Sequence, residues 1–165
     1  MADAATMTLS AAMLPDEIAV TLDSLTFAYT PADGDDKWFY GLVNVATSSS
    51  DLISGSFLSK AAGTSAASST ATIATGDKVK FLFIKNTATT DGSSATNESV
   101  YICLDGGTAA YNLGDVLEIG TGESWYGKLT NTTVGDLHAV TGDSNGSSGG
   151  EGVVQCIVAA IIDDV

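Results

Sequence analysis

The sequence predicts an all-β protein, an antiparallel β-sandwich with jelly-roll-like architecture and an N-terminal arm. Between Val79 and Leu129, apolar runs of strand length alternate with breaks rich in Gly, Asp and Asn, as expected for short strands joined by turns. No apolar pattern with helical spacing persists for three turns, so helix is expected to be minor. About ten short strands at this spacing are typical of a sandwich or a jelly roll.

Length and composition indicate a single domain. The chain has 165 residues, of which 44% are hydrophobic, and this is enough to bury one core. We predict an arm at residues 1–16 and one β-sandwich domain at residues 17–165. The arm is rich in Ala and ends at Pro15-Asp16, a pair that disfavours a continuing helix.

The first strands of the domain show a change of phase. Apolar residues alternate with polar or small ones at positions 18, 20 and 22, and then in the opposite phase at positions 25, 27 and 29. One extra residue at Asp23-Ser24 would keep both sets on one face, so we expect a β-bulge or a bend there. The run Trp38–Val45, aromatic and β-branched, is expected to be the next strand.

The rest of the chain divides into loops and strands. Lys60–Thr70 is almost entirely Ala, Ser, Thr and Gly and is expected to be a loop. The predicted strands are residues 70–75 (a short edge strand), 78–85, 99–104, 108–113, 116–119, 123–129, 134–140 and 153–162. The last of these is apolar on both faces, which predicts a central strand or an edge covered by another subunit.

The two cysteines lie inside apolar runs. Cys103 and Cys156 are therefore expected to be buried free thiols that act as small apolar side chains. A disulfide stays an alternative if the two strands are neighbours. Asp105-Gly106 carries the strongest signal for a tight turn, because both residues tolerate a positive φ.

Charge excludes several classes of partner. The formal net charge is −14, and no two basic residues are adjacent. Nucleic acids and anionic membranes are attracted by clustered Lys and Arg, so we expect neither as a partner. No run approaches the roughly 18 apolar residues of a membrane span, and no secretory signal is evident at the N-terminus. Synthesis in a cytoplasm is the expectation.

Residues equipped for chemistry are few. His138 is the single histidine, and no Gly-x-Ser-x-Gly motif accompanies it, so a structural role is favoured. Clusters of oxygen-bearing side chains, Asp33, Asp35 and Asp36 in one turn and Asp143, Asn145, Ser147 and Glu151 in another, do not match the spacing of an EF-hand. The carboxylates Glu98, Glu118, Glu123 and Glu151 form no recognisable catalytic pair. We predict no catalytic residue, no metal, no cofactor and no enzymatic activity.

Two aromatic clusters are candidates for contact with a partner. Adjacent residues of a strand point to opposite faces, so one ring of Trp125-Tyr126, and at least one in Trp38–Tyr40, must face away from the core unless it is covered. Such a ring either lies on the rim of a sheet, anchors an interface or stacks on a sugar.

Three sequence elements carry a resemblance to a known group of proteins. They are Ile-Lys-Asn-Thr at residues 84–87, Leu-Asp-Gly-Gly at residues 104–107 and Gly-Glu-Ser at residues 122–124. In this order, before a closing apolar strand, they resemble the small β-rich capsid decoration proteins of tailed bacteriophages of the marine and cyanophage type. The resemblance covers residues 78–162 and brings no catalytic residues; Thr121 stands where many of these proteins have Pro.

The resemblance implies a virion structural protein. Such a protein would be made in the host bacterial cytoplasm and would decorate or cement the capsid surface by binding the major capsid protein, with copies assembled as a trimer or dimer. The predicted contact residues are Met7, Leu9, Met13, Leu14, Trp125 and Tyr126. The alternative is a carbohydrate-binding or adhesin module of a phage tail or fibre, with Trp125 and Tyr126 as its platform.

Overall fold

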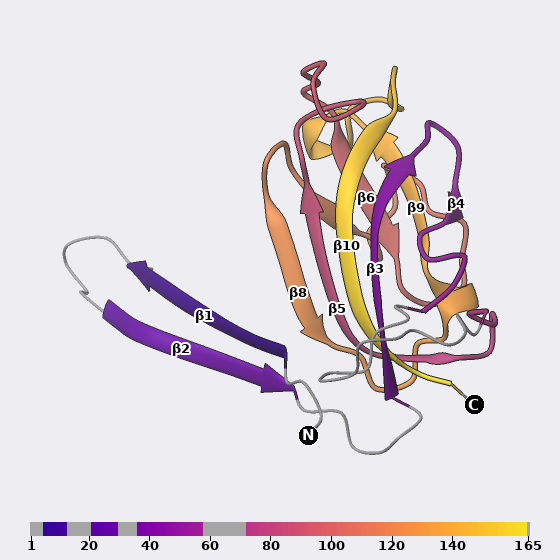
Figure 1. Cartoon of the computed structure of the whole chain (residues 1–165). Helices are drawn as coiled ribbons and strands as arrows, with labels where there is room; N and C mark the ends of the chain where they lie inside the picture. Colours follow the sequence, from indigo (N-terminus) through magenta and orange to yellow (C-terminus); the bar gives the residue numbers. More distant parts are fainter. Residues whose placement is uncertain (1–4, 13–20, 30–35, 58–71, 165) are drawn as a thin grey trace.

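The structure is a computed structural model that describes residues 5–12, 21–29, 36–57 and 72–164, and it confirms the predicted all-β sandwich. Two four-stranded antiparallel sheets pack face to face, with a two-stranded sheet at the N-terminus (Figure 1). The strands are β1 Ala5–Ala12, β2 Thr21–Tyr29, β3 Asp36–Val45, β4 Ser50–Asp51, β5 Lys78–Asn86, β6 Ser99–Cys103, β7 Leu117–Ile119, β8 Ser124–Lys128, β9 His138–Gly142 and β10 Val154–Asp163. Helix in these ranges is limited to two 3-10 turns, Val134–Asp136 and Ser144–Gly146.

The strand order is that of a jelly roll. The first sheet reads β3-β10-β5-β8 and the second reads β4-β9-β6-β7. When the eight sandwich strands are counted from β3, these orders become 1-8-3-6 and 2-7-4-5, the arrangement produced by two interlocked Greek keys. The predicted jelly-roll-like architecture is therefore confirmed.

Strand β10 is central, which is one of the two placements that the sequence predicts for it. It pairs with β3 from Val154 to Asp163 on one side and with β5 on the other. From Val154 to Ala160 its side chains alternate between buried positions that face the second sheet and outer positions that are partly covered, and Ile161 on the outer face is fully buried. Both faces carry apolar residues because the inner face forms the core and the outer face carries a second, smaller cluster.

The main core lies between the two sheets. The largest fully buried side chains of the described chain are Leu52, Ile53, Leu82, Ile84, Ile102, Ile119, Leu137, Ile161 and Ile162. All of them except Ile161 belong to the cluster between the sheets. Burial of one such side chain contributes roughly 1.5–3 kcal/mol relative to exposure. Because the core occupies the inner face of each sheet, the other face of each sheet points away from the sandwich.

Three predicted strands differ from those of the structure. Residues 108–113 form turns rather than a strand, and Ala109 and Tyr111 pack on the outer face of the second sheet against Tyr101, Cys103 and Val140. These two apolar side chains therefore pack onto the face of a sheet, and their segment does not add a strand to it.

In the predicted strand 134–140, only the part from His138 onward is β9. The backbone N and the Oγ1 of Thr133 each donate a 2.8 Å hydrogen bond to Asp136 Oδ2. These two bonds stabilise a 3-10 turn where the sequence predicts extended backbone. Residues 72–75 likewise form no strand, since Thr72 makes one isolated bridge to Ser56. Residues 58–71, which include the predicted loop at 60–70, lie outside the described ranges.

The N-terminal strands pair only with each other. β1 and β2 form an antiparallel hairpin that Figure 1 shows apart from the sandwich. Leu9 pairs with Leu25 and Ala11 with Leu22, so the single residue Ser10 between them on β1 lies opposite two residues on β2. The extra residue falls at Asp23-Ser24 and confirms the predicted bulge. Part of the predicted arm is therefore a strand.

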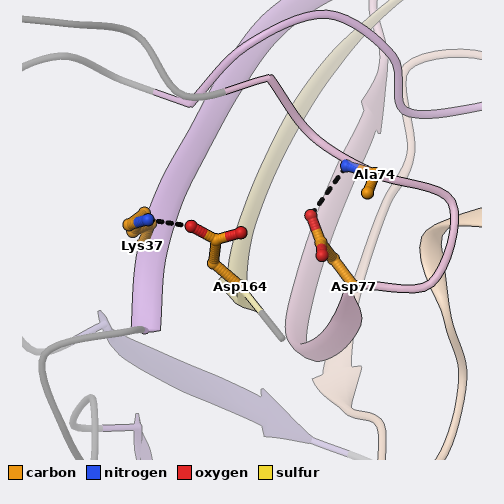
Figure 2. A network of polar contacts seen from close by, with 4 residues as sticks. All are labelled: Lys37, Ala74, Asp77 and Asp164. Atoms are coloured by element: carbon orange, nitrogen blue, oxygen red, sulfur yellow. Dashed lines mark hydrogen bonds and ion pairs between the residues drawn. The ribbon is translucent and has the colours of Figure 1, made fainter.

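One end of the first sheet is joined by ionic contacts. Figure 2 shows Lys37 at the start of β3 in an ion pair with Asp164, which follows β10. Lys80 Nζ lies 2.9 Å from Asp163 Oδ2 on the neighbouring side of β10. Asp77, which precedes β5, accepts a 2.8 Å hydrogen bond from the backbone N of Ala74 (Figure 2). The two ion pairs link β3 and β5 to the end of β10.

Candidate functional site

The most distinctive surface is the outer face of the β3-β10-β5-β8 sheet. Residues that lie opposite one another in the ladders form three rows across it. From β3 to β8 the rows are Trp38, Ile161, Phe81 and Lys128; Tyr40, Ala159, Phe83 and Tyr126; and Leu42, Ile157, Lys85 and Ser124. We call these three rows the outer apolar face. It consists of eight large apolar or aromatic side chains, one Ala, one Ser and two lysines, and it contains no carboxylate.

The β3 side of this face is open. Tyr40 is 54% exposed and Leu42 is 60% exposed, whereas Phe83 and Ile157 beside them are partly buried. The second sheet differs, because residues 104–116 of the same chain fold over its outer face. Large apolar side chains exposed side by side on one face are typical of a surface that contacts a partner.

Positive charge is concentrated on the same sheet. Five of the six basic residues of the sequence lie in its strands: Lys37, Lys78, Lys80, Lys85 and Lys128. Those strands contain only two carboxylates, Asp36 and Asp163. In a chain of net charge −14, this sheet is therefore the least acidic part of the described surface.

The two predicted contact residues on β8 lie on opposite faces. Trp125 packs against the core between the sheets, and its ring covers Gly127, where an added Cβ would lie 2.8 Å from Trp125 Cη2. Tyr126 belongs to the outer cluster with Phe81 and Ile161. The two rings thus share no surface, and a sugar platform made of both is not formed.

The other predicted contact residues belong to the N-terminal segment. Met7 and Leu9 lie on β1, where they pair with Phe27 and Leu25 of β2. Met13 and Leu14 lie outside the residues that the structure describes. Leu42 and Ile157 are not among the contact residues that the sequence predicts, whereas Tyr40 belongs to the cluster Trp38–Tyr40, in which at least one outward-facing ring is expected.

His138 begins β9, an inner strand of the second sheet. Its Nε2 is 3.4 Å from Asp51 Oδ1 on β4, and its Nδ1 is buried with no hydrogen-bond partner. Cys103 lies opposite His138 in the β6-β9 ladder. Burial raises the pKa of the Cys103 thiol, which donates to Asp105 Oδ1 over 2.8 Å. A thiol held in this neutral form is a poor nucleophile.

The two cysteines are both free and buried, as the sequence predicts. Cys156 lies on the inner face of β10, and burial raises the pKa of its thiol to about 12. Both thiols therefore act as packing side chains.

Three of the carboxylates considered as catalytic candidates, Glu98, Glu118 and Glu123, accept hydrogen bonds from other residues of the chain. Glu118 and Glu123 line an open cleft of about 580 Å³ together with Asn97, Gly120, Thr121 and Ser144. Glu123 Oε2 accepts a 2.9 Å hydrogen bond from Gly120 N, and Glu118 Oε1 accepts one of 2.9 Å from Ser99 Oγ. Glu98 is buried and accepts from the backbone N of Glu151.

The candidate cation turns are placed as follows. Asp143 Oδ2 accepts hydrogen bonds from Ser147 and Ser148 of its own turn. Asp33 and Asp35 lie outside the described ranges, and Asp36 begins β3. Within those ranges, no group of three or more His, Cys, Asp or Glu side chains is arranged to hold a metal ion.

In the part of the chain that the structure covers, no helix has the length and apolar character needed to cross a membrane. Comparison with protein families, with characterised proteins and with solved structures finds no match to this chain.

Proposed function

We propose that this chain is a virion structural protein of a tailed bacteriophage that decorates or cements the capsid by binding the major capsid protein. The observation that carries the proposal is the outer apolar face, which is rich in large apolar side chains, is free of carboxylates and leaves Tyr40 and Leu42 exposed. Jelly rolls occur in viral capsid proteins, and this supports the proposal by analogy of fold alone.

The proposed action is associative. Exposed Tyr40 and Leu42 would lose contact with water when the face meets a capsid protein, and burial of a large apolar side chain is worth roughly 1.5–3 kcal/mol. A subunit that binds the assembled shell and not its dissociated parts stabilises the shell by mass action. The protein would be made in the host bacterial cytoplasm and would reside at the capsid surface.

The experiment adds purified protein to phage heads that lack it and measures occupancy by cryo-electron microscopy. Ile157→Asp places a charge within the outer apolar face, on the inner strand β10 and directly beside the exposed Leu42. Leu113→Asp is the matched control, because Leu113 is 44% exposed and lies in the connection that covers the other sheet.

We expect ordered density for the wild type and for Leu113→Asp, and loss of density for Ile157→Asp. Heads left bare by the wild-type protein, or decorated equally by both variants, would refute the proposal. Binding of the wild type to a glycan array instead would favour the carbohydrate-binding alternative.

A further inference from the structure

We propose that β3 is a docking edge for β3 of a second copy of this chain, in an antiparallel pair centred on Gly41. The two β3-β10-β5-β8 sheets would then form one continuous eight-stranded sheet about a two-fold axis. This dimer goes beyond the proposed capsid role, since it specifies a self-association surface and its register.

The first argument is that one side of β3 has no strand partner. β3 lies at the edge of its sheet and pairs through all ten residues with β10 alone. Across the described ranges, no backbone hydrogen bond reaches residues 36–45 from the other side. In an antiparallel edge strand, alternate residues direct both N–H and C=O outward, and these groups form a template for a further strand.

The second argument is that β3 lacks the features that keep edges from pairing. Proteins blunt an edge with proline, with a bulge, with charge or with short length. Between Trp38 and Val45 there is no proline and no charged residue, and the ladder with β10 shows no shift of register. The opposite edge strand, β8, has five residues and ends in Lys128.

The third argument is that the pattern is self-complementary about Gly41. In this register Tyr40 lies opposite Leu42 of the second copy, and Leu42 lies opposite its Tyr40. These are the two most exposed large apolar residues of the described chain, at 54% and 60%, and each pair would cover both. Aromatic and aliphatic residues directly opposite stabilise a ladder by about 0.2–1 kcal/mol beyond Ala pairs.

Charge favours the same register. The charged residues of β3 are Asp36 and Lys37, both at one end. Antiparallel pairing about Gly41 places Lys37 opposite Val45 and Asp36 opposite Ala46, so no like charges meet, whereas a parallel pair in register would align Lys37 with its own copy.

A two-fold interface uses the same patch on both subunits and so requires a surface that complements itself. The segment Trp38–Asn44 meets this requirement because its large exposed residues lie symmetrically one position either side of Gly41. Gly41 itself adds no side chain at the axis; a Cβ there would meet the Phe39 ring at 3.0 Å.

The test is cross-linking that depends on register. Residues directly opposite in an antiparallel ladder have Cα atoms about 4.5–5.5 Å apart, within reach of a disulfide, and a shift of two residues exceeds it. Tyr40→Cys and Leu42→Cys are purified separately, mixed and oxidised with glutathione disulfide. The native thiols are both buried and do not compete.

We expect the mixture to form a disulfide-linked dimer that neither variant forms alone. A mixture of Tyr40→Cys with Asn44→Cys, both on the exposed side of β3, is the off-register control and should stay uncross-linked. Cross-linking of Tyr40→Cys with itself, or of the control mixture, would overturn the register. Absence of any cross-link would overturn the pairing.

Sedimentation equilibrium provides a second measurement without new cysteines. The wild type should be a dimer, and Leu42→Lys, which places like charges beside the axis, should raise the dimer dissociation constant about tenfold or more. Leu113→Lys should leave it unchanged. A wild type that is monomeric yet decorates heads would sink the dimer and keep the capsid role; a dimer that binds no head would do the reverse.

Discussion

The side chain of Asn86 joins the two sheets, since its Nδ2 donates a 2.9 Å hydrogen bond to the carbonyl oxygen of Glu98. Asn86 ends β5 in the first sheet, and Glu98 directly precedes β6 in the second. The same Nδ2 lies 3.3 Å from the carbonyl oxygen of Ile119, and Oδ1 accepts from the backbone N of Ala88 at 2.8 Å. Asn86 is fully buried, so none of these groups has water as an alternative partner.

Asn86→Leu is expected to lower the free energy of unfolding by about 3 kcal/mol, because similar volume is kept while buried backbone groups lose their partner. Urea denaturation with an unchanged m value would measure it. Asn44→Leu, at an exposed position of β3, is the control and should change stability by less than about 0.5 kcal/mol. Equal effects of the two changes would contradict the bridging role.

Gly150→Ala is expected to destabilise the fold by about 2–3 kcal/mol. The added Cβ would lie 2.1 Å from Thr141 Oγ1 and 2.7 Å from the Thr141 carbonyl carbon, and backbone cannot move aside as a flexible side chain can. Gly152→Ala, two residues away and with nothing within 4 Å of its Cβ, should be nearly neutral. Thermal melts of both variants measure the contrast, and a neutral Gly150→Ala would show that the approach to Thr141 is looser than this.

Asp136 links stability to pH. The two bonds from Thr133 hold the pKa of its carboxyl below the ordinary value of 3.8. A carboxyl whose pKa is lower in the folded chain stabilises the fold above the unfolded value and loses that contribution as the pH falls through the folded value. Asp136→Asn should thus cost up to about 1 kcal/mol at pH 7 and progressively less in acid.

Urea denaturation at pH 7 and at pH 3 tests this difference, with Asp115→Asn on an exposed turn as the matched control. A deficit of Asp136→Asn that stays constant between the two pH values would exclude a contribution from ionisation.

Both thiols are expected to resist modification in the folded protein. Burial raises the pKa of Cys156 to about 12 and also raises the pKa of Cys103, so little thiolate exists at pH 8. A colorimetric thiol assay should detect no reaction under native conditions and two thiols per chain in denaturant. Rapid labelling of either cysteine in the native state would contradict the burial of its sulfur.

The sequence predicts correctly those strands whose local residue pattern matches the structure that the segment adopts in the fold. The runs at residues 78–85 and 153–162 alternate or are apolar throughout, and each is bounded by turn residues, so local pattern and final structure agree. The run at 108–113 has the same local appearance. Its Ala109 and Tyr111 instead pack across β6 and β9, a choice that depends on residues far away in the chain.

The candidate site divides in the same way. That adjacent aromatic residues on a strand face opposite sides follows from backbone geometry, and Trp125 and Tyr126 obey it. Which ring meets the core depends on where β8 sits in the sheet. Tyr40 and Leu42 gained importance only because β3 is an edge strand with no further neighbour among the described strands.

The order of residues alone determined the all-sheet class, the irregularity at Asp23-Ser24, the coverage of both faces of the last strand and the burial of both thiols, because each follows from side-chain period, turn chemistry or hydrophobicity within a short segment. Tertiary structure alone decided which sheet face the chain covers with its own loop and which face it leaves open. That decision depends on contacts between distant segments, and local sequence carries no record of them.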